Sequence, residues 1–277
     1  MDAYRHCEAL VREADKDRFL ATLFAPAEAR LHLFALYAFN IEIARVREVA
    51  RTPMAGEIRL QWWRDALAGE GHGEVRANPV AAALLNTLEA GRLSPAPLLD
   101  LIEARSFDLY DDPVPHLDAL YGYVRKTSSN LVAAAGKILA GDDPLIGTLA
   151  GPAGIGSGLA RLLQAFPAHA SRGQIFLPAD LLARHGVAPT DILAGRPSDG
   201  LRAVLADLRA RARLELAEAE RAAPLRPKAA APAFLPVALA GPLLARLEAS
   251  ENTPFTPVEV PQWRRQWTLW RAARRAR

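Results

Sequence analysis

The 277-residue chain is 51% hydrophobic and 23% charged, with a formal net charge of +3. This composition supplies a sizeable core and excludes a wholly disordered chain, and so small a charge gives no reason to expect nucleic-acid binding. Cys7 is the single cysteine. No intrachain disulfide can therefore form, as is typical of a reducing compartment such as the cytoplasm.

The N-terminal segment carries acidic residues at positions 2, 8, 13 and 15, unlike a secretory signal or a transit peptide. No run approaches the roughly 18 uninterrupted apolar residues expected of a membrane span. The sequence therefore predicts a soluble or peripheral protein.

Helical signals dominate the chain, and strand signals are weak. Apolar residues recur at three- and four-residue steps, and prolines or polar caps precede several of these runs. The predicted helical segments are 26–44, 115–141, 144–165 and 199–222. A further helix is predicted to start at 94–95 and to carry apolar residues as far as 102. Proline-rich stretches at 111–115, 224–232 and 252–261 are expected to be loops, and 219–233 a mobile connection. We expect one all-α domain over 1–277.

The segment 144–165 is apolar nearly all round, which is typical of a helix in the middle of a bundle. It contains Gly151, Gly154, Gly156 and Gly158. Each glycine costs a helix roughly 1 kcal/mol relative to alanine, so close packing or a kink is the expected reason for them.

Three passages together resemble one known family. They are Phe24 to Arg30 running on to 35–40, Tyr121-Gly122-Tyr123-Val124, and the segment 158–178, which ends in Arg172-Gly173-Gln174-Ile175-Phe176-Leu177-Pro178. They resemble conserved helices of the squalene/phytoene synthase family, best over 3–190. The resemblance implies an isoprenoid-synthase-like helical bundle with a central cavity.

In active members, the resemblance implies two Asp-x-x-x-Asp motifs on facing helices, which hold Mg²⁺ and so stabilise the leaving diphosphate. Here these positions fall on 44–48 and 165–169. Ala44 and Ala165 cannot bind a metal, and His169 is a poor Mg²⁺ ligand that is expected at a helix end. Pro167 is expected to interrupt the second helix. No metal or other cofactor is therefore expected. Mg²⁺ is expected only if the chain is an active synthase.

Cations stand at or near both degenerate motifs. Arg45 and Arg161 either pair with Glu42, Glu48 or Asp108, or hold a bound anion directly. Asp108 lies four residues before Asp112, so the two could share a metal, or they mark a helix end running into a turn. The candidate ligand-binding residues are Glu42, Arg45, Glu48, Asp108, Arg161, Gln164 and Arg172.

The C-terminal segment, about 261–277, is predicted to form a basic amphipathic helix. Trp263, Trp267 and Trp270 share one face, with arginines around them and no acidic residue. Such a helix either docks on a membrane surface or packs its tryptophan face back on the bundle.

Within the family, the segments Phe176 to Asp180 and Ala38 to Glu42 are similar to the branch of respiratory complex I assembly factors. This resemblance implies a catalytically degenerate member that acts by binding a prenyl or lipid-like small ligand. Its expected partners are respiratory complex subunits, and its expected location is cytoplasmic and peripheral on the inner membrane. The alternative is an active prenyltransferase that condenses two prenyl diphosphates in squalene or carotenoid biosynthesis.

Overall fold

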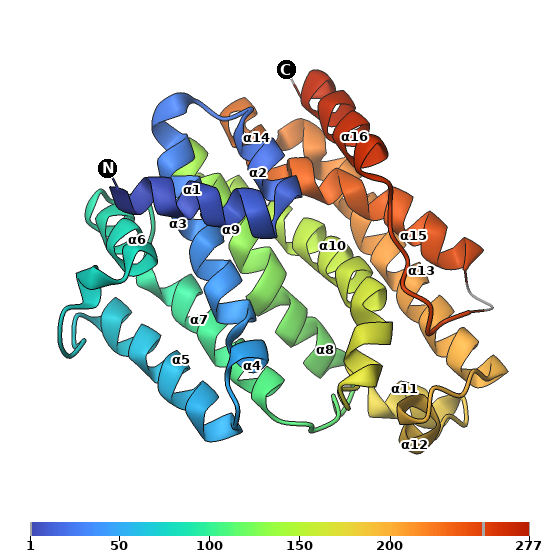
Figure 1. The fold of residues 1–277 in the computed structure, drawn as a ribbon. Coiled ribbons are helices and arrows are strands. Elements are labelled where there is room, and N and C mark those ends of the chain that lie inside the picture. Colours follow the sequence, from blue (N-terminus) through green and yellow to red (C-terminus); the bar gives the residue numbers. More distant parts are fainter. Residues whose placement is uncertain (1, 251–252, 277) are drawn as a thin grey trace.

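The computed structural model describes residues 2–250 and 253–276, and within these ranges every regular element is helical (Figure 1). The all-α prediction is therefore confirmed. The α-helices are α1 (Asp2–Ala14), α2 (Lys16–Thr22), α3 (Ala27–Ala44), α4 (Val46–Val49), α5 (Pro53–Ala68), α6 (Pro79–Glu89), α7 (Pro95–Ser106), α8 (Leu117–Val124), α9 (Asn130–Ala140), α10 (Pro144–Ser171), α11 (Ala179–Arg184), α12 (Pro189–Leu193), α13 (Asp199–Ala222), α14 (Ala231–Phe234), α15 (Ala240–Ala249) and α16 (Gln262–Arg275).

Short 3₁₀-helical or π-helical turns join these elements. Within the described residues, η3 is the π-helical turn and the others are 3₁₀-helical. The six are η1 (Val75–Ala77), η2 (Phe107–Leu109), η3 (Arg125–Ser129), η4 (Ala223–Leu225), η5 (Lys228–Ala230) and η6 (Leu235–Leu239).

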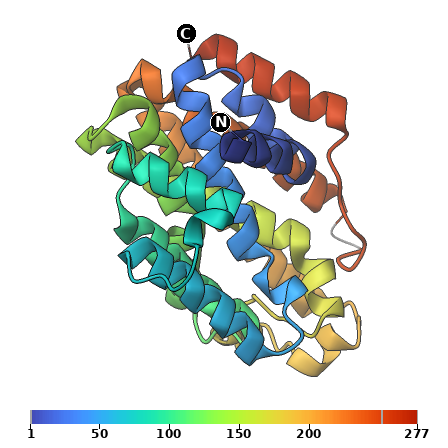
Figure 2. The ribbon, with the colours of Figure 1, turned by 60° about the vertical axis from the view of Figure 1, so that its left-hand side comes forward.

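The long helix α10 runs through the middle of the bundle and packs on α9, η3, α13 and α15 (Figure 1). On one side, α1 lies across α3 and α6 (Figure 2). Two large apolar clusters make up the core. One is built mainly from α3, α6, α7 and α9, and the other from α10, α11, α13 and α15. The end of α3 with α4, and the C-terminal half of α10, carry the two degenerate motifs, with Ala44 and Ala165 half-buried and Arg45 and Glu48 exposed.

Close packing explains three of the four glycines in α10. A side chain at Gly154 would meet the backbone of Ser129, at Gly156 it would meet Ala212 and Leu216, and at Gly158 it would meet Val124. The carbonyl group of Gly151 accepts a hydrogen bond from the Ser129 hydroxyl at 2.9 Å. The glycines therefore let α10 approach η3 and α13 more closely than larger residues would allow.

The predicted helix 115–141 is confirmed as a helical run over 117–140, in which the π turn η3 joins α8 to α9. Two other expectations about local structure were wrong. Pro167 does not interrupt α10, which continues to Ser171 with Pro152 and Pro167 inside it. The expected mobile connection 219–233 is largely helical, because α13 extends to Ala222 and η4, η5 and α14 follow it.

One helical stretch, Lys228–Ala249, is apolar and long enough to cross a membrane by length and composition. This differs from the expectation that no segment comes near that length. Half of its most apolar window is buried in the bundle, and the buried core helix of a helical protein meets the same criterion.

Candidate functional site

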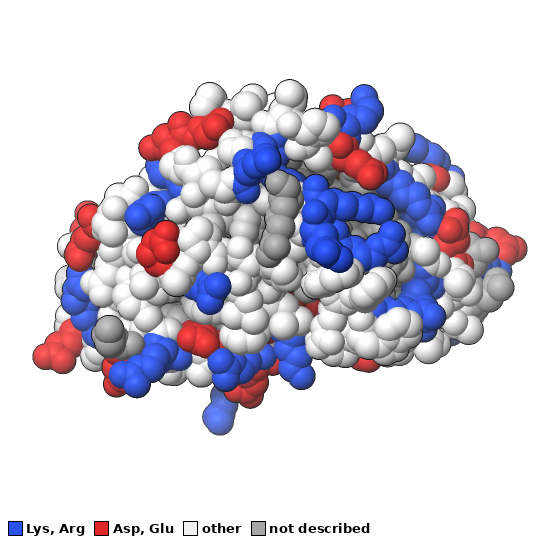
Figure 3. Space-filling model, turned by 90° about the horizontal axis from the view of Figure 1, so that it is seen from above, with Lys and Arg blue, Asp and Glu red and all other residues white. Residues whose placement is uncertain are grey.

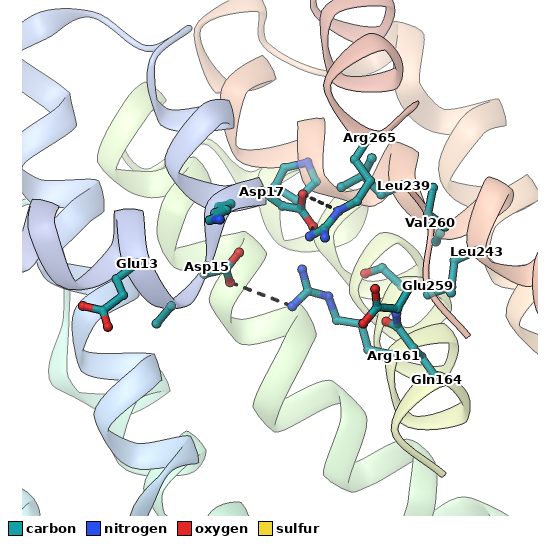
Figure 4. Close-up of a pocket in the computed structure, with 15 residues that line it drawn as sticks. Glu13, Asp15, Asp17, Arg161, Gln164, Leu239, Leu243, Glu259, Val260 and Arg265 are labelled. Carbon is teal, nitrogen blue, oxygen red and sulfur yellow. Dashed lines mark hydrogen bonds and ion pairs between the residues drawn. The ribbon is translucent and has the colours of Figure 1, made fainter. Parts of the chain in front are cut away.

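A cavity of about 460 Å³ lies between the start of α2, the middle of α10, the η6–α15 region and the start of α16. Figure 4 shows its walls, with Asp15 and Arg161 approaching each other across it and Arg265 meeting Asp17. Apolar side chains of Leu239, Leu243 and Val260 line the other side. Charged groups of both signs and an apolar wall thus share one space.

Asp15 is the most strongly held carboxylate of this cavity. It caps α2 by accepting the Arg18 backbone N–H at 3.0 Å, and it pairs with the Arg18 guanidinium at 2.5 Å. Arg161 lies 3.9 Å away. Burial raises the pKa of Asp15, but Arg18 and Arg161 outweigh burial and hold that pKa at about 2. Asp15 is therefore ionised at neutral pH and already paired.

Asp17 is buried and binds Arg265 of α16 through both carboxylate oxygens, with Arg265 Nε donating to Oδ1 at 2.9 Å. This two-point contact is the strong geometry for an arginine–carboxylate pair. It joins α2 to the C-terminal helix and closes one edge of the cavity.

Two of the predicted residues line this cavity. Arg161 is 43% exposed because it faces the cavity, and its contact with the carboxylate of Asp15 is long, at 3.9 Å. Gln164 donates from its side-chain amide to the Val258 carbonyl at 3.1 Å, which fixes the segment that leads to α16. Arg161 therefore keeps hydrogen-bonding capacity that a ligand in the cavity could use.

Glu42 and Arg45 line a separate pocket of about 550 Å³, together with Trp62, Trp63 and Asn78. Burial raises the pKa of Glu42, against the hydrogen bond from Asn78. Arg45 and Arg161 thus line different pockets, so the structure does not bring these two arginines together around one anion.

Glu48, in the first degenerate motif, meets a side chain that lies just beyond the second. Glu48 of α4 accepts a hydrogen bond from Arg172, which follows α10, at 3.0 Å, and both side chains are about half exposed. The first motif also straddles a helix end, because α3 ends at Ala44 and Arg45 caps it. The single carboxylate of the first motif is thus engaged in an ion pair, and the second motif offers Ala165 and His169 in place of carboxylates.

Asp108 lies in η2, buried, and is a partner in a compact polar cluster. Its carboxylate accepts hydrogen bonds from Arg105 at 2.8 Å and from the Tyr123 hydroxyl at 2.7 Å. The Gln174 amide donates to its backbone carbonyl at 2.9 Å. Asp112 lies beyond the end of η2 in a non-helical stretch, as the helix-end alternative predicted.

His169 packs beside this cluster, with its ring centroid 4.6 Å from that of Phe176. Its Nδ1 is buried and has no hydrogen-bond partner. Burial lowers the pKa of His169 to about 4, and Arg172 acts in the same direction. His169 is therefore neutral at physiological pH and serves as a packing residue within α10.

This arrangement predicts a pH dependence of stability. The unfolded chain binds a proton at His169 near its ordinary pKa of 6.5, whereas the folded chain does so only near 4. Between these values the unfolded state binds more protons, so the free energy of unfolding falls as pH drops from 6.5 to 4, by roughly 2–3 kcal/mol.

Urea unfolding at several pH values measures this change. His169→Leu should flatten the profile in that window, whereas His72→Gln, on an exposed segment, should leave it in place. An unchanged profile in His169→Leu would contradict the assignment.

The donors at the two motifs do not fit Mg²⁺. Ala44 and Ala165 offer no ligand, Glu48 is paired with Arg172, and His169 is turned into an aromatic contact. Across the described part of the chain, no group of three or more His, Cys, Asp or Glu side chains is placed to hold a metal.

Sequence reasoning missed Asp15, Asp17 and Arg265 as cavity residues. The charged run from Asp15 to Arg18, placed directly before the apolar Phe19 and Leu20, was the available signal. It marks a cap and a charged helix start, but its partners Arg161 and Arg265 are far away in sequence.

Known proteins resemble this chain over nearly its whole length. A sequence model described as squalene/phytoene synthase matches residues 11–271. The "NADH dehydrogenase (ubiquinone) complex I, assembly factor 6" of Rattus norvegicus is 30% identical over 92% of this chain and 77% of its own length. "Phytoene synthase 1, chloroplastic" of Arabidopsis thaliana is 27% identical, over 92% and 62% respectively.

The solved squalene synthase of Alicyclobacillus acidocaldarius superimposes with a TM-score of 0.78 at 25% identity, covering 92% of this chain and 96% of that one. The isoprenoid-synthase-like fold is thereby confirmed. The helices, their order and these matches lead to one assignment: the chain belongs to the squalene/phytoene synthase family.

Proposed function

We propose that this protein is a non-condensing member of the family, which acts by binding and serves in respiratory complex I assembly. The observation that carries this proposal is the ion pair between Glu48, the one carboxylate of the first motif, and Arg172, which lies three residues beyond the second motif. A positive side chain there repels divalent metal ions, and the remaining motif positions offer no oxygen ligands. Without metal, a diphosphate group has no electrophilic assistance to leave.

The role in complex I assembly is supported by relatives. Assembly factors of rat and human, each named for complex I, are 30% and 29% identical to this chain over more than nine-tenths of it. The proposal places the protein peripherally at the inner membrane, on the cytoplasmic side, with respiratory complex subunits as its partners.

The binding site in this proposal is the cavity between α2, α10, α15 and α16. Arg161 would contact an anionic head, and Leu239, Leu243 and Val260 would contact an apolar tail. Arg265, which also lines this cavity, is neutralised by Asp17 through a two-point contact. Arg161, 3.9 Å from Asp15, is freer to meet a ligand. An amphipathic prenyl- or lipid-like ligand fits a cavity with one basic wall and one apolar wall.

The second candidate function is condensation of two prenyl diphosphates. The similarity to a plant phytoene synthase, 27% identical over 92% of this chain, favours it. It requires Mg²⁺ to be held by a set of side chains other than the family's motif positions.

One experiment separates the two functions. The purified full chain, given farnesyl diphosphate, Mg²⁺ and NADPH, should release no pyrophosphate above a heat-inactivated control. Farnesyl diphosphate alone should raise the melting temperature of the wild type, by roughly 5 °C at a hundred times its Kd. Arg161→Ala should lose this increase.

Arg221→Ala is the matched control, because Arg221 forms an exposed pair with Glu218 within α13, away from the cavity. It should keep the full increase in melting temperature. Pyrophosphate release above the control, together with a coupled C30 product, would establish condensation instead, and equal stabilisation of Arg161→Ala would remove the cavity from the proposal.

A further inference from the structure

The outer face of α16 is apolar and aromatic, yet it faces solvent. Trp263, Trp267 and Trp270 are 64%, 54% and 40% exposed. At 3.6 residues per turn, these three positions fall within about 60° of arc. Trp267 and Trp270 stack on each other, with ring centroids 4.9 Å apart. A solvated helix would gain nothing from three large rings held in this way.

The opposite face of the same helix is already packed. Leu269 and Ala273 are buried against Ala21 and Leu235, and Arg265 binds Asp17. The alternative in which the tryptophan face packs back on the bundle is therefore wrong: α16 packs through its other side, and the tryptophan face points away from the protein.

Positive charge accompanies the tryptophans without any acidic residue in α16. Four exposed arginines have no ion-pair partner among the described residues: Arg264, Arg271, Arg274 and Arg275. Arg264 lies over the Trp263 ring at 5.1 Å, and Arg274 over the Trp270 ring at 4.7 Å. Figure 3 shows basic side chains gathered on the upper face of the molecule, where α16 lies in Figure 1.

We propose that the outer face of α16 docks on an anionic lipid bilayer, with the helix lying in the plane of the surface. This inference deepens the peripheral position in the proposed function and rests on it. The indole rings would sit at the boundary of headgroups and acyl chains, a position that suits a ring with an apolar body and one N–H donor. The arginines would pair with lipid phosphates while their stems cover apolar surface.

The composition of the face favours lipid over an acidic protein. Tryptophan and arginine interleave along one helix, and the exposed apolar side chains at its centre are all tryptophans. At 14 residues, α16 is too short to cross a bilayer, which takes roughly 20 residues, so it would lie on the surface rather than span it.

Flotation of the full chain with vesicles tests the proposal. Wild type should float with vesicles of phosphatidylglycerol and phosphatidylcholine, and hardly at all with phosphatidylcholine alone. Changing all four unpaired arginines of α16 to glutamine should lower the partition coefficient by roughly 1,000-fold. Changing Trp263, Trp267 and Trp270 to serine should also abolish flotation, with an unchanged melting temperature, because these rings are solvent-exposed.

A charge-matched control removes four arginines from other exposed sites, and it should float like the wild type. Its substitutions are Arg12→Gln, Arg196→Gln, Arg213→Gln and Arg221→Gln.

Three outcomes overturn the proposal. If the wild type does not float, the face does not bind anionic lipid. Equal loss in both arginine variants reduces the effect to net charge, and flotation of the serine variant removes the tryptophans from the contact. None of these outcomes bears on the farnesyl diphosphate assays, which contain no vesicles, so the membrane contact and the cavity function can fail independently.

Discussion

Replacing Asp108 with alanine is expected to destabilise the fold by about 3–5 kcal/mol, because it leaves the largely buried guanidinium of Arg105 without its carboxylate. Asp108 also accepts the Tyr123 hydroxyl at 2.7 Å, so the substitution removes two hydrogen bonds from one cluster. Chemical unfolding, followed by helical circular dichroism, measures the change.

The matched comparison is Glu218→Ala, which breaks the exposed Arg221–Glu218 pair in α13. Exposed pairs contribute about 0–1 kcal/mol, so this variant should unfold nearly as the wild type does. Adding Arg105→Met to Asp108→Ala should restore part of the lost stability, because the unpaired charge is then gone. A loss below about 1 kcal/mol in Asp108→Ala would mean that the cluster is hydrated and does not anchor η2 to α8.

Gly154→Ala is expected to cost about 2–3 kcal/mol, even though alanine is the better helix former. An added Cβ would lie 2.2 Å from the Ser129 Cα, and a backbone atom cannot move aside as a flexible side chain can. Either α10 and η3 separate or the π turn distorts. Thermal or urea unfolding measures the cost.

Gly151→Ala in the same helix provides the control. A Cβ at Gly151 meets nothing within 4 Å, so this variant should gain roughly 0.5–1 kcal/mol from helix propensity alone. If both variants were stabilised, the close contact between α10 and η3 would not exist as described.

The Asp108→Ala and Gly154→Ala substitutions both test the surroundings of the π turn η3. The π turn η3 lies between α8, which carries Tyr123, and α9, and it packs directly on α10. An irregular turn of this kind inside a helix often marks a functional or strained position. Here it follows the helix that carries Tyr123 and lets α10 pass close to Ser129, so the polar cluster and the glycine contact depend on one local geometry.

Much of the fold could be predicted from local pattern. The segment 26–44 is α3, and the segment 199–222 is α13, because three- and four-residue apolar spacing and capping residues are local properties. Breaks inside helices were harder to predict. Pro167 stays within α10 although proline usually ends a helix, and η3 divides a segment whose apolar pattern is continuous.

The candidate site was predicted less completely, and the reason is sequence distance. Glu48 and Arg172 are 124 residues apart, and Asp17 and Arg265 are 248 apart. Residue types alone show that both groups are charged, but not that they meet. For the same reason Arg45 and Arg161 could be named together from the sequence, although they line different pockets.

By itself, the amino-acid sequence determined the helical class, the resemblance to the family, the absence of aspartates at the motif positions and the two-faced character of the last helix. These depend on residue identity and on spacing within a few turns. Tertiary structure alone decided which charges are neutralised, which arginine still faces the cavity and which side of α16 points outward. These depend on how helices far apart in the chain pack, and packing depends on the shapes of the whole core rather than on any one segment.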